Sequence, residues 1–429
     1  MRYLNKKVQT FWLLNHQKKK LKKKTKRNVN STIIEEEEIQ TVIQHWIRRL
    51  KIKLGWIQYF DKIVVKYATN FFMFEVFRSS SKLLKTFTGH TDWVSSIDYS
   101  TLDCGQYICS GSFDKKVCVW DVDTSQQIRS FNGHSSDVNC VKFSSYHYYN
   151  HHRNVICSSS GDSTIRFWDI KKNQQFQIFN EHKSWIGNIE FSSFSGGRYL
   201  CSGSFDKTIR LWDVETSKLL NVFNEHGGVW CVDMSPLQSN ISNNNSESNS
   251  IGVIGGSGYT ICSGSWDNTI CIWDIETAKQ LTVFKGHQYY VKSLKYGSNE
   301  LGIGGGANTI LSGSFDSSVR LWDIRSGQQI QRFNGHVNYV YAVEYSPFVV
   351  NNIEVGGSSN VICSVSGDNT ILFWDIRSNK NKLHEINEKK NGVMSLKFLQ
   401  LRKNKKSNNN SGCSASLCYG SMRSIYIWG

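Results

Sequence analysis

The chain has 429 residues and a net charge of +16, with 51 Lys and Arg against 35 Asp and Glu. This length is ample for a large hydrophobic core, and the chain contains 14 tryptophans but only two prolines. No apolar run reaches the ~18 residues that a membrane-spanning helix needs, and no apolar segment near the start is as long as that of a secretory signal. We therefore expect an intracellular protein without a membrane span, cytoplasmic or nuclear.

Residues 1–34 are predicted to form a basic, disordered arm. The first 30 residues carry 11 Lys or Arg and no Asp or Glu, most of them in KKKLKKKTKR at 18–27. Dense runs of like charge repel one another and rarely fold. Three interpretations stay open: a solvated tail, a nuclear import signal, or contact with nucleic acid or an anionic surface through 18–27.

Residues 35–78 are predicted to form a helical hairpin. EEEEIQTVIQHWIRRL at 35–50 places its apolar residues on one helical face, with glutamates in the first turn and arginines near the end, as the helix dipole favours. Gly55 marks a break, and 56–77 is a second, very apolar helix. Packing within the chain and association with a partner or a second copy both fit this pattern. The sequence does not indicate the oligomeric state.

The rest of the chain repeats one phrase, which ends in Trp-Asp. A Gly-His or Glu-His pair precedes each of the six intact copies, and a worn seventh copy at 418–429 ends in Trp-Gly. The intact copies lie at 110–121, 158–169, 202–213, 263–274, 312–323 and 364–375. A repeat of this size cannot bury its own apolar faces, so we expect it to stack on its copies.

Each unit reads as four short antiparallel strands. In the first unit these are VSSIDYS (94–100), YICSGS (107–112), KVCVWDV (116–122) and QIRSF (127–131), with turn residues between them. One such sheet is too small to be stable alone.

These features together resemble the WD40 repeat family over residues 82–429. The resemblance implies an all-β fold, a seven-bladed β-propeller, preceded here by the small α-helical segment. The segment KLLKTF at 82–87 looks like a fourth strand without its first three, whereas 417–429 supplies second and third strands without a fourth. The resemblance implies that 82–87 closes the last blade, which leaves only short, protected sheet edges.

The resemblance also implies a buried hydrogen-bond network in each intact unit. A partly buried Asp and His need partners, and a satisfied network stiffens a unit rich in turns. The Ser, His and Asp have the composition of a catalytic triad, but they recur in all six intact units, which favours a structural role and no enzyme activity. The residues are His90, Ser110, Asp114 and Trp120 in the first unit and His182, Ser202, Asp206 and Trp212 in the third.

We expect neither a metal nor a cofactor. The run YHYYNHHR at 146–153 lacks the spacing of a zinc site and is predicted to be a solvated loop. The glycines at 304–306 lack the Lys and Ser/Thr of a phosphate-binding loop. Unpaired cysteines recur just before the second-strand serine, which indicates a small apolar core position; they are Cys109, Cys157, Cys201, Cys262 and Cys363.

The sequence therefore predicts a non-catalytic scaffold that binds protein or peptide partners on one face of the ring. The alternative is a nucleic-acid-associated platform that uses the basic arm. The resemblance implies that large side chains beside the Gly-His loops and the Asp turns point to this face, where aromatic residues resemble a binding hot spot. The candidate partner-binding residues are Trp93, Phe113, Trp185, Phe205, Trp230, Trp266, Tyr290, Lys292, Phe315, Tyr339 and Tyr341.

Overall fold

The computed structural model divides the chain into two compact units, Met1–Thr69 and Asn70–Gly429. It describes residues 74, 77–79, 81–100, 105–225, 227–235, 259–297, 309–352, 357–378, 382–388, 392–400 and 415–429, without the side chains of 349–360 and 400. The predicted arm 1–34 and most of the predicted hairpin 35–78 lie outside these residues. The fold described below is that of the second unit.

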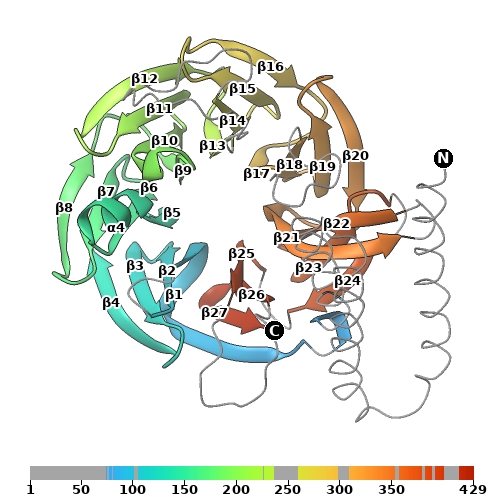
Figure 1. Ribbon diagram of the computed structural model, residues 1–429, viewed down its shortest axis with the longest axis horizontal. Helices are drawn as coiled ribbons and strands as arrows, with labels where there is room; N and C mark the ends of the chain where they lie inside the picture. The colour runs from blue at the N-terminus through green and yellow to red at the C-terminus, as the bar shows by residue number, and fades with distance from the viewer. Residues whose placement is uncertain are drawn as a thin grey trace, which may run out of the picture. The chain divides into compact units, whose positions relative to one another are not determined.

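The strands of this unit form four-stranded antiparallel blades around a ring, so the predicted all-β propeller is confirmed (Figure 1). Blade 1 uses the second half of β1 (Leu83–Ser100), then β2 (Tyr107–Ser112), β3 (Lys116–Asp121) and β4 (Gln126–Asn132). Blade 2 is β5 (Val138–Phe143), β6 (Val155–Ser160), β7 (Ile165–Asp169) and β8 (Gln174–Phe179). Blade 3 is β9 (Ile186–Phe191), β10 (Tyr199–Ser204), β11 (Thr208–Asp213) and β12 (Lys218–Asn224).

The second half of the ring repeats this order. Blade 4 is β13 (Val229–Met234), β14 (Thr260–Ser265), β15 (Ile270–Asp274) and β16 (Gln280–Phe284). Blade 5 is β17 (Val291–Tyr296), β18 (Thr309–Ser314), β19 (Ser318–Asp323) and β20 (Gln328–Asn334). Blade 6 is β21 (Val340–Asn352), β22 (Gly357–Ser366), β23 (Thr370–Asp375) and β24 (Lys382–Asn387). Blade 7 is β25 (Ser395–Gln400), β26 (Ala415–Gly420), β27 (Met422–Trp428) and the first half of β1.

The strand β1 belongs to two blades. Its first half pairs with β27, from Leu83 opposite Trp428 to Thr88 opposite Ser424, and its second half pairs with β2 from Val94 onward. One 18-residue strand therefore joins the first blade to the last. This pairing covers the sheet edge that blade 7 would otherwise expose.

The hydrophobic core lies between the blades. Each cluster of buried side chains takes members from two neighbouring blades, and such clusters occupy all seven interfaces. At the closing interface, for example, Phe87 and Ile425 of blade 7 pack with Val94 and Trp120 of blade 1. No blade buries its own faces, which is why the fold needs its copies. The five repeat cysteines are completely buried, so their predicted core position is confirmed.

The compact unit also takes in two residues that precede β1. Phe74 and Phe77 have helical backbone, and both are buried against blade 6. Their rings lie 5.5 Å and 5.1 Å from the ring of Phe348. These two side chains, which the sequence assigns to the end of the hairpin, thus pack on the propeller.

Two segments differ from expectation. The run 146–153 was predicted to be a loop, but Ser145–His151 form helix α4, which the Ser144 side chain caps, and His147 is buried. The second segment is 351–360, whose composition of Asn, Ser and Gly is typical of a disordered loop, and this expectation is wrong in part. Strands β21 and β22 continue as a paired hairpin from Val349 opposite Asn360 to Asn352 opposite Gly357. A short 3-10 turn, η2 (Ser195–Gly197), precedes β10. Among the described helices, none is long and apolar enough to cross a membrane.

Candidate functional site

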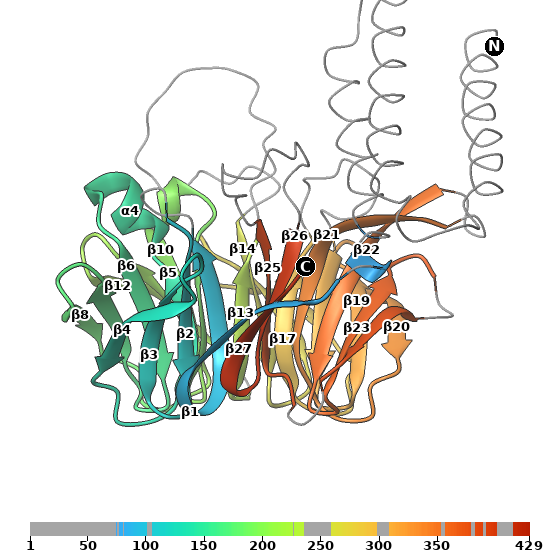
Figure 2. The ribbon, with the colours of Figure 1, turned by 90° about the horizontal axis from the view of Figure 1, so that it is seen from below.

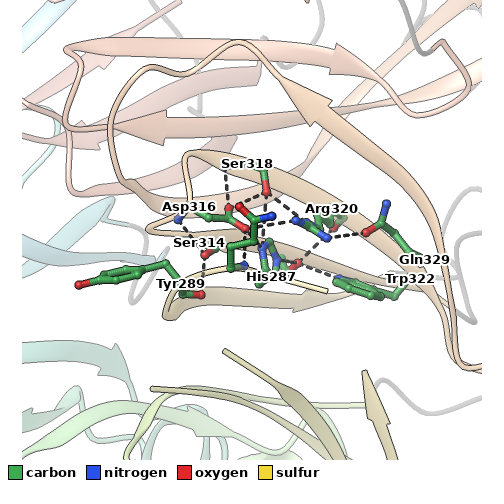
Figure 3. Close-up of polar contacts among 10 residues, drawn as sticks. His287, Tyr289, Ser314, Asp316, Ser318, Arg320, Trp322 and Gln329 are labelled. Atoms are coloured by element: carbon green, nitrogen blue, oxygen red, sulfur yellow. Dashed lines mark hydrogen bonds and ion pairs between the residues drawn. The ribbon is translucent and has the colours of Figure 1, made fainter. Parts of the chain in front are cut away.

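The hydrogen-bond network of blade 5 shows how a blade is held together (Figure 3). Trp322 Nε1 donates to Ser312 Oγ at 2.8 Å, and Ser312 Oγ lies 2.7 Å from His287 Nε2. His287 Nδ1 lies 2.8 Å from Asp316, whose carboxylate also accepts the Ser318 hydroxyl at 2.6 Å. With His287 protonated at Nδ1, every donor in this hydrogen-bond network has an acceptor.

The first and third blades have the same geometry. Trp120 and Trp212 each donate to a serine at 2.8 Å, and each histidine contacts its aspartate at 2.7–2.8 Å. Burial favours a neutral carboxyl, but the hydrogen bonds from His182 and from the backbone N–H of Lys183 outweigh it and hold the pKa of Asp206 well below its usual value. The corresponding bonds lower the pKa of Asp114 to about 2. Ser110 and Ser202 are completely buried, so no substrate can reach their hydroxyls.

Blades 4 and 7 use a carboxylate where the other networks use histidine. In blade 4 the buried Glu225 accepts hydrogen bonds from Ser263 and, at 3.1 Å, from Trp273 Nε1, while His226 lies outside the described residues. In blade 7 Trp428 Nε1 donates at 3.1 Å to the Tyr419 hydroxyl, which donates to Glu388. Both glutamates stand one position before the expected histidine, where the other blades have Gly or an exposed Glu.

The networks fix the loops that carry the candidate binding residues. In blade 5 the Ser314 hydroxyl donates to the Tyr289 carbonyl at 2.9 Å, and the Phe315 N–H donates to the Tyr290 carbonyl at 2.9 Å. The same backbone bond joins Phe205 to Trp185 at 2.8 Å in blade 3. Because the strands are antiparallel, these turns and loops share one face of the ring. Helix α4 lies on the opposite face (Figure 2).

On this face, aromatic side chains of blades 3 to 6 form one contiguous surface, which we call the aromatic arc. Ring centroids along it lie 6.1 Å apart for Trp185 and Phe205, 4.7 Å for Phe205 and Trp266, 4.8 Å for Trp266 and Tyr290, and 4.4 Å for Phe315 and Tyr339. Within the described residues the arc consists of Trp185, Phe205, Trp230, Trp266, Tyr289, Tyr290, Phe315, Tyr339 and Tyr341.

Four side chains of the arc remain widely exposed. The exposed fraction is 46% for Trp185, 43% for Trp266, and 41% for both Tyr289 and Tyr339. The residue Tyr289 was not among the sequence candidates, although it directly precedes Tyr290 in the same loop. Its ring stacks nearly parallel to that of Tyr339, with 6.3 Å between centroids. Large, rigid, exposed aromatic rings held by a stiff scaffold are typical of binding hot spots.

Two of the candidates stand apart from the arc. Trp93 and Phe113 belong to blade 1, and no ring contact joins them to the arc among the residues that the structure describes. The equivalent positions of blade 2 are Asp137 and Gly161, which carry no ring. The candidate surface is therefore divided into the arc on blades 3 to 6 and a separate pair on blade 1.

The centre of the ring contains a set of charged residues that the sequence interpretation missed. The fifth residue of the first strand, counted from Val94 in blade 1, is charged in blades 1 to 6, and in blade 7 the third residue of β25 is charged. These residues are Asp98, Lys142, Glu190, Asp233, Lys295, Glu344 and Lys397. Lys142 lies 2.6 Å from Glu190, Lys295 lies 3.6 Å from the same carboxylate, and Lys397 lies 3.5 Å from Asp98. Lys295 of blade 5 and Glu190 of blade 3 are separated by the whole of blade 4 along the ring. Their contact therefore lies in the middle of the channel.

No group of three or more His, Cys, Asp or Glu side chains that could hold a metal ion occurs in the described part of the chain. The three histidines of the 146–153 run do not form one. The arrangement on the arc is thus apolar and aromatic with one cation, Lys292, whose Nζ lies 3.8 Å from the centre of the Trp230 ring.

The comparisons with known proteins agree with this architecture. The family model "WD domain, G-beta repeat" matches residues 81–121, 125–169, 173–213, 217–274, 278–323 and 327–375, more than half of the chain. A segment of 53 residues is 43% identical to a probable E3 ubiquitin ligase complex SCF subunit, sconB, of Aspergillus terreus (strain NIH 2624 / FGSC A1156). That segment is 12% of this chain and only 8% of the Aspergillus protein. By its repeats, its blades and the family match, the chain belongs to the WD40 repeat family.

Proposed function

We propose that this protein is a scaffold that holds a protein partner on the aromatic arc and so assembles a larger complex. WD40 propellers are protein-interaction scaffolds, and the observation that carries the location is the arc itself. Four large aromatic side chains, each more than 40% exposed, lie on neighbouring blades. They do not belong to the hydrophobic core of the blades. Exposed aromatic surface of this kind is costly in water and is stabilised when a partner covers it.

The name of the Aspergillus relative supports an assembly role. That protein is named as a subunit of a ubiquitin ligase complex, but the matched segment is too short to transfer its partners to this chain. The ten described cysteines are all free and buried, which favours a reducing compartment, so we place the protein inside the cell, in the cytoplasm or the nucleus.

The test is a comparison of partner capture by three forms of the full chain. In the double variant Trp266→Ala, Tyr339→Ala the arc loses two half-exposed rings, and each hot-spot truncation weakens binding by about 2 kcal/mol or more, roughly 30-fold. The control is Tyr149→Ala on α4, because Tyr149 is an aromatic residue that is 68% exposed on the opposite face. We expect the double variant to lose the partners that wild type and control retain, at equal melting temperature.

Retention of the same partners by the folded double variant would place the binding site elsewhere. The basic run at 18–27 supports a separate, second proposal of contact with nucleic acid. Salt-dependent retention on RNA that disappears when 18–27 is neutralised would support it, and unchanged retention would refute it.

A further inference from the structure

The strand geometry directs Lys292 into the mouth of the ring. In β17 the register against β18 shifts between Val291 and Ser293, so Lys292 is the extra residue of a β-bulge. The same shift occurs at this position in the first strand of blades 4 and 6, where the bulged residues are Trp230 and Tyr341. A bulge re-aims one side chain away from the normal alternation of the strand. The side chain of Lys292 thereby reaches the face of the Trp230 ring.

The ammonium group of Lys292 has no counter-ion in the described residues. The three lysines deeper in the channel each face a carboxylate: Lys142 and Lys295 contact Glu190, and Lys397 contacts Asp98. In contrast, Lys292 Nζ lies 3.8 Å from the centre of the Trp230 ring and contacts no carboxylate among the described residues. A partly buried cation is costly unless it is paired, and one cation–π contact does not replace a carboxylate.

A second donor at the same place also lacks an acceptor. The indole N–H of Trp230 is buried and makes no hydrogen bond within the described part of the chain. Buried N–H groups are nearly always paired, so an unpaired one beside an unpaired ammonium needs an explanation. An anion at the mouth of the ring would supply the charge that Lys292 lacks and would bring an acceptor close to the Trp230 indole.

We propose that Lys292 is the specificity residue of the arc and receives a side-chain carboxylate, Asp or Glu, that the partner presents between apolar residues. This inference rests on the proposed function of the arc. The surrounding rings would cover the apolar neighbours of that carboxylate and exclude water from the ion pair, which strengthens it. A cationic ligand does not fit, since Lys292 already occupies the face of Trp230.

The charge balance favours a carboxylate over a phosphate group. One ammonium matches a single negative charge, whereas a phosphoserine carries about −1.5 to −2 and is bound best by clusters of Arg. Among the described residues, Lys292 is the one cationic side chain that contacts an aromatic ring of the arc. A phosphate at this position would leave uncompensated negative charge among aromatic rings.

The probe is a phage library of random short peptides, presented to the full chain in about 0.3 M salt, which screens the charge of the basic run at 18–27. Peptides that also bind the Trp266→Ala, Tyr339→Ala variant are discarded, so that arc-dependent binders remain. For the tightest one, Kd is measured with its Asp or Glu and with the matching amide, on wild type and on Lys292→Met.

We expect the enriched peptides to share an Asp or Glu flanked by apolar residues. On wild type the change to the amide should weaken binding at least about 30-fold, as loss of one partner of a desolvated charge pair does. On Lys292→Met the acidic and amide peptides should bind within a factor of about two of one another, and Lys292→Arg should retain the acidic preference. The melting temperature of Lys292→Met should not fall, because the change removes an unpaired charge.

The outcomes separate the two proposals. If no arc-dependent peptide emerges, the proposed function fails and this inference fails with it. If arc-dependent peptides emerge without an acidic residue, or if Lys292→Met keeps the acidic preference, only the role of Lys292 is refuted. Phosphoserine in place of the acidic residue should bind no tighter than Glu. Binding that is tenfold tighter and depends on Lys292 would make this a phosphate site and overturn the carboxylate assignment.

Discussion

At the residue scale, the His–Asp–Ser–Trp networks determine whether a blade keeps its shape. In blade 3 the side chain of Asp206 accepts hydrogen bonds from His182, Thr208 and the backbone of Lys183. These bonds reach both the turn after β10 and the loop before β9. The networks therefore support stability and, through the loops, the positions of Trp185 and Phe205.

Replacing Asp206 with Ala should lower the free energy of unfolding by about 2–4 kcal/mol, because it leaves the buried His182 and two N–H groups without an acceptor. The equivalent residue of blade 4, Asp267, is exposed, and its described side-chain contacts are with Thr269. The control Asp267→Ala should cost less than about 1 kcal/mol. Urea denaturation of both variants measures the difference, and equal losses would contradict the structural role given to the buried network.

The pH dependence of binding provides a residue-scale test of Lys292. Burial lowers the pKa of Lys292 to about 8, below its usual value. The thiols of Cys231 and Cys140 face Lys292. Burial raises the pKa of both thiols and also that of the Tyr341 hydroxyl, so all three groups are neutral near pH 8. An acidic peptide binds the protonated lysine, so its affinity should fall as pH rises above about 8, approaching tenfold per pH unit.

The measurement is the Kd of a selected acidic peptide between pH 7 and 10. The matched control is Lys292→Arg, whose guanidinium stays charged throughout this range, so its Kd should be constant. A wild-type Kd that is independent of pH, or one that changes equally in the Arg variant, would show that Lys292 does not carry the charge that the peptide recognises.

At the element scale, the closing strand β1 joins the two ends of the propeller. Its residue Phe87 is 1% exposed and contacts Trp120 of the next blade with ring centroids 5.9 Å apart. The side chain of Leu84, three residues earlier in the same strand, is 43% exposed. Phe87 therefore tests the packing of β1 against the next blade, and Leu84 serves as a control in the same strand that does not take part in this packing.

We expect Phe87→Ala to destabilise the full chain by about 3–5 kcal/mol, as truncation of a buried Phe does, and Leu84→Ala by no more than about 0.5 kcal/mol. Thermal and urea unfolding of the two variants give both values. If Phe87→Ala were as mild as Leu84→Ala, β1 would not be docked in solution, and the closure of the ring through this strand would be refuted.

The sequence predicted the strands well because each unit repeats the same alternation and the same turn residues. It failed where the repeat supplies no pattern. The connection after β5 differs in length from unit to unit, so nothing in the other blades indicated that Ser145–His151 form a helix. Likewise, the strand extension at Val349–Asn352 depends on backbone pairing across a connection that is particular to blade 6.

The sequence could predict which residues lie at the candidate site, but not which of them contact one another to form a continuous surface. The residues beside each histidine and each turn aspartate follow from the repeat, yet their grouping depends on which neighbouring blades carry a ring. On the side of blade 2, two residues without a ring, Asp137 and Gly161, lie between the pair Trp93 and Phe113 and the arc. The sequence did not predict that Glu225 takes the place of a histidine in the network of blade 4. Glu225 stands one position before the expected histidine, and the sequence EHGG at 225–228 does not indicate which of the two residues enters the network.

At the scale of the whole molecule, the ring has two distinct faces and a charged centre. One face carries the arc, held by the networks below it, and the central lysines and carboxylates neutralise one another across blades. The other face carries α4 (Figure 2). Such a molecule is suited to hold a partner on one face while its other surfaces remain available for assembly.

The most direct test of this account is site-specific photo-crosslinking in cells that express the protein. A benzophenone amino acid placed at Trp266 or at Tyr339 should form an adduct with one and the same partner protein, because both rings belong to one arc. The same amino acid at Tyr149, which is more exposed but lies on the opposite face, should not capture that partner. Capture of the partner from position 149 but from neither arc position would contradict the assignment of the arc as the binding surface.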